Sequence, residues 1–186
     1  MATMIILPED YKFDSFGVTS FDRIDMSEQI TPRSYLQFSQ VDLEAGADAR
    51  SNINALSNAK RALHFQVELL AKSFGIKGLS RKASQGFQNQ LEFCGHCGLT
   101  TPKIVQKMNR VRNLTEHEYY LPNRSEAEDV VDVVTLFISA TERFLRLFPS
   151  GIEWSSFEKT RPDLPDIWWL DFPPYEGVIY LLLPEE

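Results

Sequence analysis

The sequence predicts a mainly α-helical protein, an antiparallel helical bundle to which the two ends of the chain add short β segments. Two long stretches repeat apolar residues at steps of three and four, the spacing of one helix face. Beyond Gly151, prolines separate short apolar segments, and this pattern is typical of strands. We therefore expect an N-terminal arm with short strands over residues 1–33, the helical bundle over 34–149, and a C-terminal extension over 150–186 whose strands pack on the bundle.

The first long helix is expected over residues 49–74. Asp48 precedes it as an N-cap, and Gly75 follows it as a C-cap. A short helix over residues 35–43 is expected before it. The apolar stripe of the long helix consists of Ile53, Leu56, Leu63, Val67, Leu70 and Phe74.

The second long helix is expected to begin at a capping box formed by Ser125 and Glu128 and to end at Pro149. Between the long helices we expect one short helix with Phe87 and Leu91 and another that starts at Thr101-Pro102. Isolated amphipathic helices cannot bury their apolar stripes, so these helices should pack together. The stripe of the second long helix consists of Val130, Val134, Phe137, Thr141, Phe144 and Phe148.

The C-terminal extension contains two expected strands, at residues 166–172 and 178–183. The second is apolar on both faces and must therefore be covered, and we expect it to pair with residues 4–7. No run of the chain approaches the roughly 20 apolar residues of a membrane-spanning helix. The first ten residues lack a basic region before their short apolar run, so no signal peptide is expected and the cytoplasm is the default compartment.

The chain of 186 residues has a net charge of −7, which is normally unfavourable for binding nucleic acid. The charge is nevertheless uneven, because Glu92 is the only acidic residue between Lys72 and Arg112, a segment rich in lysine and arginine. This asymmetry predicts a basic face on an acidic protein. The alternative is an ordinary solvated surface on which these charges do not converge.

The segment most indicative of chemistry is Arg-Asn-Leu-Thr-Glu-His-Glu-Tyr at residues 112–119. RNA carries its own nucleophile, the 2′-hydroxyl group, so a ribonuclease needs only a group that moves protons and a cation that stabilises the phosphate. His117 suits the first role and Arg112 the second. The motif predicts a metal-independent ribonuclease, and Lys103, Lys107 and Arg110 are expected to bind its RNA.

The spacing within this motif adds a constraint. Residues five positions apart on an ideal helix point about 140° away from each other, so Arg112 and His117 would diverge on one continuous helix. Either the helix breaks between them, or two copies of the chain assemble one shared site. We favour the second explanation, since a two-fold axis would bring two arginines and two histidines together.

These residues resemble the hallmark of the HEPN superfamily, an arginine, a polar residue and, after a short gap, a histidine. Arg112, Asn113, His117 and Tyr119 match the Arg-x4-His-x-Tyr form found in toxins that are paired with minimal nucleotidyltransferases. The resemblance covers residues 48–148. It implies a helical homodimer that cleaves RNA without a metal or other cofactor, as a toxin or defence component. It also implies that Asn113 orients the site and that Tyr119 is a target for AMPylation by a nucleotidyltransferase-type antitoxin.

Two alternatives remain for this motif. The superfamily also includes noncatalytic members, so the bundle is alternatively a nucleotide- or protein-binding module. Arg112 and His117 would then form a surface ion-pair network with Glu116 and Glu118. The acidic total charge of the chain favours this second class of function.

Weaker signals come from cysteine, histidine and tryptophan residues. Cys94-Gly95-His96-Cys97 has the spacing of a thiol oxidoreductase motif, and two chains together could also form a zinc site from it. Its helical context favours an ordinary glycine-rich turn instead. We therefore expect no metal site. His64 is expected to pack inside the bundle or to line a cleft. The three tryptophans are also expected to pack inside the protein, and stacking on RNA bases is the alternative role. They are Trp154, Trp168 and Trp169.

Overall fold

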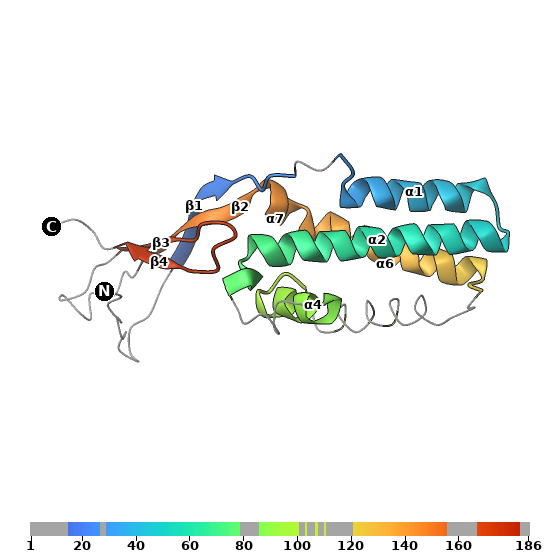
Figure 1. Cartoon of the computed structure of the whole chain (residues 1–186). Coiled ribbons are helices and arrows are strands. Elements are labelled where there is room, and N and C mark those ends of the chain that lie inside the picture. The colour runs from blue at the N-terminus through green and yellow to red at the C-terminus, as the bar shows by residue number, and fades with distance from the viewer. Residues whose placement is uncertain are drawn as a thin grey trace.

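The computed structural model describes residues 15–26, 29–78, 86–100, 121–155 and 167–182, together with Lys103, Lys107 and Arg110. Helices lie side by side along the length of α2, and the strands gather at one end of them (Figure 1). The described helices and the sheet contact each other through α7 and β2. The expected helix start at Thr101-Pro102 and the expected strand at residues 4–7 lie outside the described residues.

The first two helices form a hairpin, α1 (Pro32–Ala45) and α2 (Ala49–Ser73). The Asp48 side chain accepts hydrogen bonds from the backbone N–H groups of Arg50 and Ser51, which confirms the predicted N-cap of the long helix. Gly75 follows α2 with φ of 84°, a conformation that disfavours side chains. The structure confirms the predicted boundaries of this long helix to within one residue. The prediction succeeded because the apolar period and both end signals agree.

The last long helix differs from its prediction at both ends. Its capping box is formed by Asn123 and Glu126. The predicted capping box of Ser125 and Glu128 is therefore wrong by two residues. The helix α6 (Arg124–Thr141) is followed by a single turn, α7 (Arg143–Arg146), and not by a continuous helix to Phe148. Phe148 instead begins strand β2, since a residue before proline favours extended backbone.

The short helix α4 (Phe87–His96) confirms the helix expected around Phe87 and Leu91. It packs against α2, where Leu91 and Cys94 are completely buried. A short 3₁₀ turn, η1 (Ile76–Gly78), follows α2 and buries Ile76 in the same core. Among the residues described, no helix is long and apolar enough to cross a membrane.

The strands form one antiparallel sheet in the order β1 (Ser15–Asp22), β2 (Phe148–Ser155), β3 (Ile167–Asp171) and β4 (Tyr180–Leu182). Residues from both ends of the sequence therefore meet, as the pairing of Val18 with Ile152 shows. Within the described part, β4 pairs with β3, while its proposed partner at residues 4–7 is outside it. The protein is thus mixed α and β, and the prediction of a mainly α bundle is wrong.

The physical reason for this error is that the sheet is a tertiary element. Residues 15–22 carry no sustained alternation of apolar and polar residues, and all eight are exposed, so local sequence has no buried face to reveal. Their strand conformation depends on backbone pairing with β2, more than 120 positions away in the chain. Pairing of that kind is not encoded in a local period.

The helices and the sheet share one hydrophobic core. Phe148 of β2 is completely buried, and its ring centroid lies 5.0 Å from that of Phe74 and 5.3 Å from that of Phe172. At the same junction, a Cβ atom on Gly75 would lie 2.0 Å from the Cα atom of Gly177. The end of α2 and the turn before β4 are therefore in close backbone contact.

Candidate functional site

The predicted catalytic residues Arg112, Asn113 and His117, and the predicted modification site Tyr119, all lie outside the described residues. Three residues before the motif are described, and the described residues resume at Leu121 after it. Lys103, Lys107 and Arg110 precede the motif, and the structure places all three in helical conformation with exposed side chains. The start of α6 follows the motif. The surroundings of the motif can therefore be built from these two flanks.

The start of α6 is held firmly against the first two helices. The Asn52 amide of α2 donates a hydrogen bond to the carbonyl oxygen of Pro122 at 3.2 Å, and both residues are buried. The Arg124 guanidinium donates to the carbonyl oxygens of Leu43 and Gly46 at the turn between α1 and α2. The chain that leaves the motif is consequently anchored to the bundle within a few residues.

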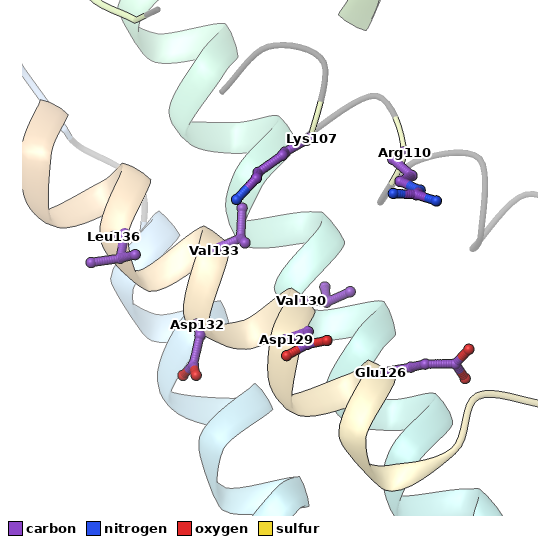
Figure 2. Close-up of a pocket in the computed structure, with 8 residues that line it drawn as sticks. All are labelled: Lys107, Arg110, Glu126, Asp129, Val130, Asp132, Val133 and Leu136. Carbon is purple, nitrogen blue, oxygen red and sulfur yellow. The ribbon is translucent and has the colours of Figure 1, made fainter. Parts of the chain in front are cut away.

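A pocket of about 550 Å³ lies between Lys107 and Arg110 on one side and α6 on the other (Figure 2). In Figure 2 the Lys107 side chain extends towards Val133 of α6, and Arg110 lies across from Val130. The pocket is large enough for a ligand the size of a nucleotide. Its described lining residues are Lys107, Arg110, Glu126, Asp129, Val130, Asp132, Val133 and Leu136.

The floor of the pocket is apolar. Val130 is buried and Val133 is half-buried, and both point towards the side of α6 on which Lys107 and Arg110 lie (Figure 2). Leu136 continues this surface one turn further along α6 and is 71% exposed. Flat ring systems pack well on such a surface because apolar contact removes both partners from water.

The electrostatic character of the pocket is mixed and not purely basic. Two of the three predicted RNA-binding residues, Lys107 and Arg110, form one side, whereas Lys103 is not among the lining residues. Glu126, Asp129 and Asp132 of α6 also line this pocket, and of these the Asp132 side chain points away from the two cations in Figure 2. The predicted basic face is therefore bordered by acidic groups, which repel the phosphates of a nucleic acid.

Sequence reasoning missed these carboxylates as part of the site. A signal for them was present, because acidic residues at positions 126, 129 and 132 are each one helical turn from the next, so neighbouring members of the set lie close together on the helix. The sequence does not show which other segment of the chain packs beside these acidic residues. The contact between α6 and the segment that carries Lys107 and Arg110 is tertiary.

The cysteine motif lies at the C-terminal end of α4, where Cys94 is helical and Cys97 is the C-cap, and only its last residue belongs to the turn that was expected. Burial raises the pKa of the Cys94 thiol to about 12, and burial also raises the pKa of Cys97. A reactive cysteine requires the opposite shift, because the thiolate is the nucleophile and the metal ligand. Both cysteines are free thiols, and no cluster of three or more metal-binding side chains occurs among the residues that the structure describes.

The remaining sequence candidates are packing residues where the structure describes them. The His64 ring is half-buried and stacks on the Phe87 ring, with centroids 4.1 Å apart. Trp168 is 3% exposed, whereas Trp154 and Trp169 are half-buried in the sheet. None of these four residues lines the pocket beside α6.

Comparisons with known proteins add no assignment: no family model, no curated protein and no solved structure matches the chain. The resemblance to the HEPN superfamily therefore stays a prediction from the motif at residues 112–119.

Proposed function

We propose that the protein is a metal-independent endoribonuclease that uses Arg112, Asn113 and His117. The observation that supports it best is that Arg110 lines a pocket of nucleotide size directly before the motif. Two peptide units keep the Cα atom of Arg112 within about 7.6 Å of that of Arg110. His117 is similarly tied to the anchored start of α6, since six peptide units to Asn123 span at most about 23 Å. The chain is therefore long enough for the motif to reach this pocket.

In the proposed reaction, the 2′-hydroxyl oxygen of the RNA attacks the adjacent phosphorus atom while His117 accepts the hydroxyl proton. The bond from phosphorus to the 5′ oxygen then breaks, which leaves a 2′,3′-cyclic phosphate and a 5′-hydroxyl end. Arg112 stabilises the extra negative charge on the phosphate oxygens, and Asn113 orients the site. The reaction requires no metal ion or other cofactor, since the nucleophile belongs to the substrate.

The departing 5′ oxygen needs a proton, and the chain offers few histidines to supply one. We propose that a second copy of the chain contributes its His117 across a two-fold axis, so that the functional unit is a homodimer. Such a nuclease would act in the cytoplasm as a toxin or defence component. A nucleotidyltransferase-type antitoxin would silence it by modifying Tyr119.

The proposal is tested by incubating a mixed-sequence RNA with the wild-type protein, Arg112→Ala and His117→Ala in the presence of EDTA. We expect the wild type to cleave and both variants to lose cleavage by at least about a hundredfold, the usual contribution of a proton-transfer group. His96→Ala, a change at the exposed end of α4, is the matched control and should cleave normally. RNA with 2′-O-methyl groups should resist cleavage.

Circular dichroism establishes whether all variants fold, and the intact mass of the wild type reveals whether the protein carries an added group, as the proposed modification of Tyr119 requires. Cleavage by His117→Ala at the wild-type rate would remove His117 from the mechanism. Failure of unmodified wild-type protein to cleave any RNA would contradict the nuclease proposal.

The second candidate is a noncatalytic nucleotide- or protein-binding module. The observation that favours it is the group of carboxylates from Glu126, Asp129 and Asp132 in the pocket, because a site dedicated to phosphates has no use for them. This function predicts saturable ligand binding without RNA cleavage by the unmodified protein. The two candidates therefore give different results in the same cleavage experiment.

A further inference from the structure

The pocket beside α6 combines three features that one ligand must satisfy together. Cations from Lys107 and Arg110 lie on one side, carboxylates lie on α6, and the valines at positions 130 and 133 form an apolar floor between them (Figure 2). A nucleotide has the matching parts, since it carries a phosphate, a flat base and polar groups on the edge of that base. The question is which base edge suits a carboxylate.

An ionised carboxylate has two oxygens that only accept hydrogen bonds. Guanine presents two adjacent donors on its Watson–Crick edge, the N1–H and the 2-amino group, so a carboxylate can bind both at once. Adenine presents an amino donor beside the N1 acceptor, and cytosine presents an amino donor beside the N3 acceptor. Uracil presents one donor between two carbonyl acceptors. Guanine is therefore the base that matches a carboxylate best.

Asp129 is the carboxylate best placed for this contact. It lines the pocket one helical turn after Glu126, next to Val130 and Val133 in the sequence of lining residues on α6. Glu126 already accepts a hydrogen bond from the Asn123 backbone at 2.9 Å, and the Asp132 side chain points away from the two cations in Figure 2. Within the described part of the chain, no ion pair engages Asp129.

We infer that the pocket beside α6 is a guanine-nucleotide subsite, in which Asp129 binds the guanine edge, Val130 and Val133 support the ring, and Lys107 and Arg110 bind the phosphate. The inference rests on the proposed ribonuclease function, because it makes this pocket the subsite that selects guanosine in the RNA next to the cut. It also gives the acidic side of the pocket a role that phosphate binding does not explain.

The test measures binding of the 5′-monophosphates of guanosine, inosine, adenosine, cytidine and uridine to the full chain by calorimetry. GMP should bind most tightly. IMP lacks the 2-amino group and should bind about tenfold more weakly than GMP, the effect of losing one hydrogen bond to a charged group. AMP, CMP and UMP should bind still more weakly. Equal binding of GMP and AMP, or no saturable binding of GMP, would overturn the inference.

Asp129→Asn gives the most specific result. An amide offers one acceptor and one donor, the arrangement that pairs with the amino group and the ring nitrogen of adenine or cytosine, so this variant should lose the preference for GMP and gain relative affinity for AMP and CMP. A loss caused only by disturbed folding would not exchange one base preference for another. Glu128→Gln is the matched control, because it makes the same charge change on α6 outside the pocket. It should leave the order of the affinities unchanged.

A parallel cleavage assay separates this inference from the proposed function. Cleavage of mixed-sequence RNA with a guanosine at a fixed position next to the cut would support both. Cleavage without any base preference would overturn the guanine subsite and keep the ribonuclease. Binding of GMP that depends on Asp129, without RNA cleavage by the unmodified protein, would keep the subsite and overturn the ribonuclease.

Discussion

The helix α2 and the strand β1 bury their residues to opposite extents. Eleven of the 25 residues of α2 are buried, whereas all eight residues of β1 are exposed. The helix lies in the middle of the bundle and contacts α1, α4 and α6, while β1 has one strand partner, β2, in the described sheet. The hydrophobic core thus depends on α2, and β1 depends on the elements next to it.

The difference between these two regions shows where the stability of the sheet originates. Strand β2 is buried at its beginning, where it leaves α7, and is only partly covered towards Ser155. The strand is therefore fastened to the core at one end and extends from it at the other (Figure 1). Because burial of apolar side chains is the main favourable contribution to folding, the junction around Phe148 should matter far more than the outer strand.

The largest effect is expected for Phe148→Ala. This change leaves a cavity between the helices and the sheet, and we expect the free energy of unfolding to fall by about 3–5 kcal/mol. The matched control is Phe16→Ala in β1, where the side chain is 75% exposed and the expected change is within about 0.5 kcal/mol. Urea denaturation followed by tryptophan fluorescence measures both. Similar losses for the two variants would contradict the comparison.

An intermediate effect is expected for a buried hydrogen bond. The Gln66 amide of α2 donates to the hydroxyl oxygen of Thr141 at 3.0 Å, and both residues are buried. Thr141→Val leaves the amide without this acceptor and should lower the free energy of unfolding by about 1–3 kcal/mol. The exposed hydrogen bond between Ser15 and Ser155 in the sheet is the comparison, and Ser15→Ala should change stability by less than about 0.5 kcal/mol.

A double variant sharpens this measurement. Gln66→Leu combined with Thr141→Val removes both polar partners, so it should be more stable than the sum of the two single changes predicts. Strict additivity in the denaturation data would show that the two side chains do not act as a pair.

The smallest effect is expected at Glu142, whose carboxylate connects the start of α1 to α7. Its carboxylate binds Arg33 of α1 and Arg146 of α7, and the hydrogen bond from Arg33 is the main cause that lowers the pKa of Glu142 below its ordinary value of 4.5. Glu142→Gln should lower the free energy of unfolding by about 1 kcal/mol at neutral pH.

The pH dependence of this difference has a defined sign. A lowered pKa in the folded state stabilises the protein fully above the unfolded value of about 4.5. The advantage of the wild type over Glu142→Gln should therefore persist from neutral pH down to that value and disappear as the pH falls further, through the lower pKa of the folded state. A difference that stays constant down to pH 3 in denaturant titrations would contradict this origin.

The sequence predicted the helices better than the strands, for reasons visible in particular residues. The limits of α2 followed from its apolar period together with Asp48 and Gly75, because a helix is a local structure with local end signals. The capping box at Asn123 was missed because Ser125 and Glu128 show the same spacing two residues later. Phe148 was assigned to a helix because a buried aromatic residue satisfies either pattern, and Pro149 was the signal against it.

By itself, the sequence determined the long helix α2, the basic residues at positions 107 and 110, and the motif at residues 112–119 that carries the proposed chemistry. Only the tertiary structure decided that Phe148–Ser155 forms a strand between β1 and β3 in one four-stranded sheet, and that Asp129 shares a pocket with Lys107 and Arg110. The physical reason is the range of the interactions. Helix hydrogen bonds and caps connect residues within four positions, whereas strand pairing and pocket formation bring together residues that are far apart in the chain.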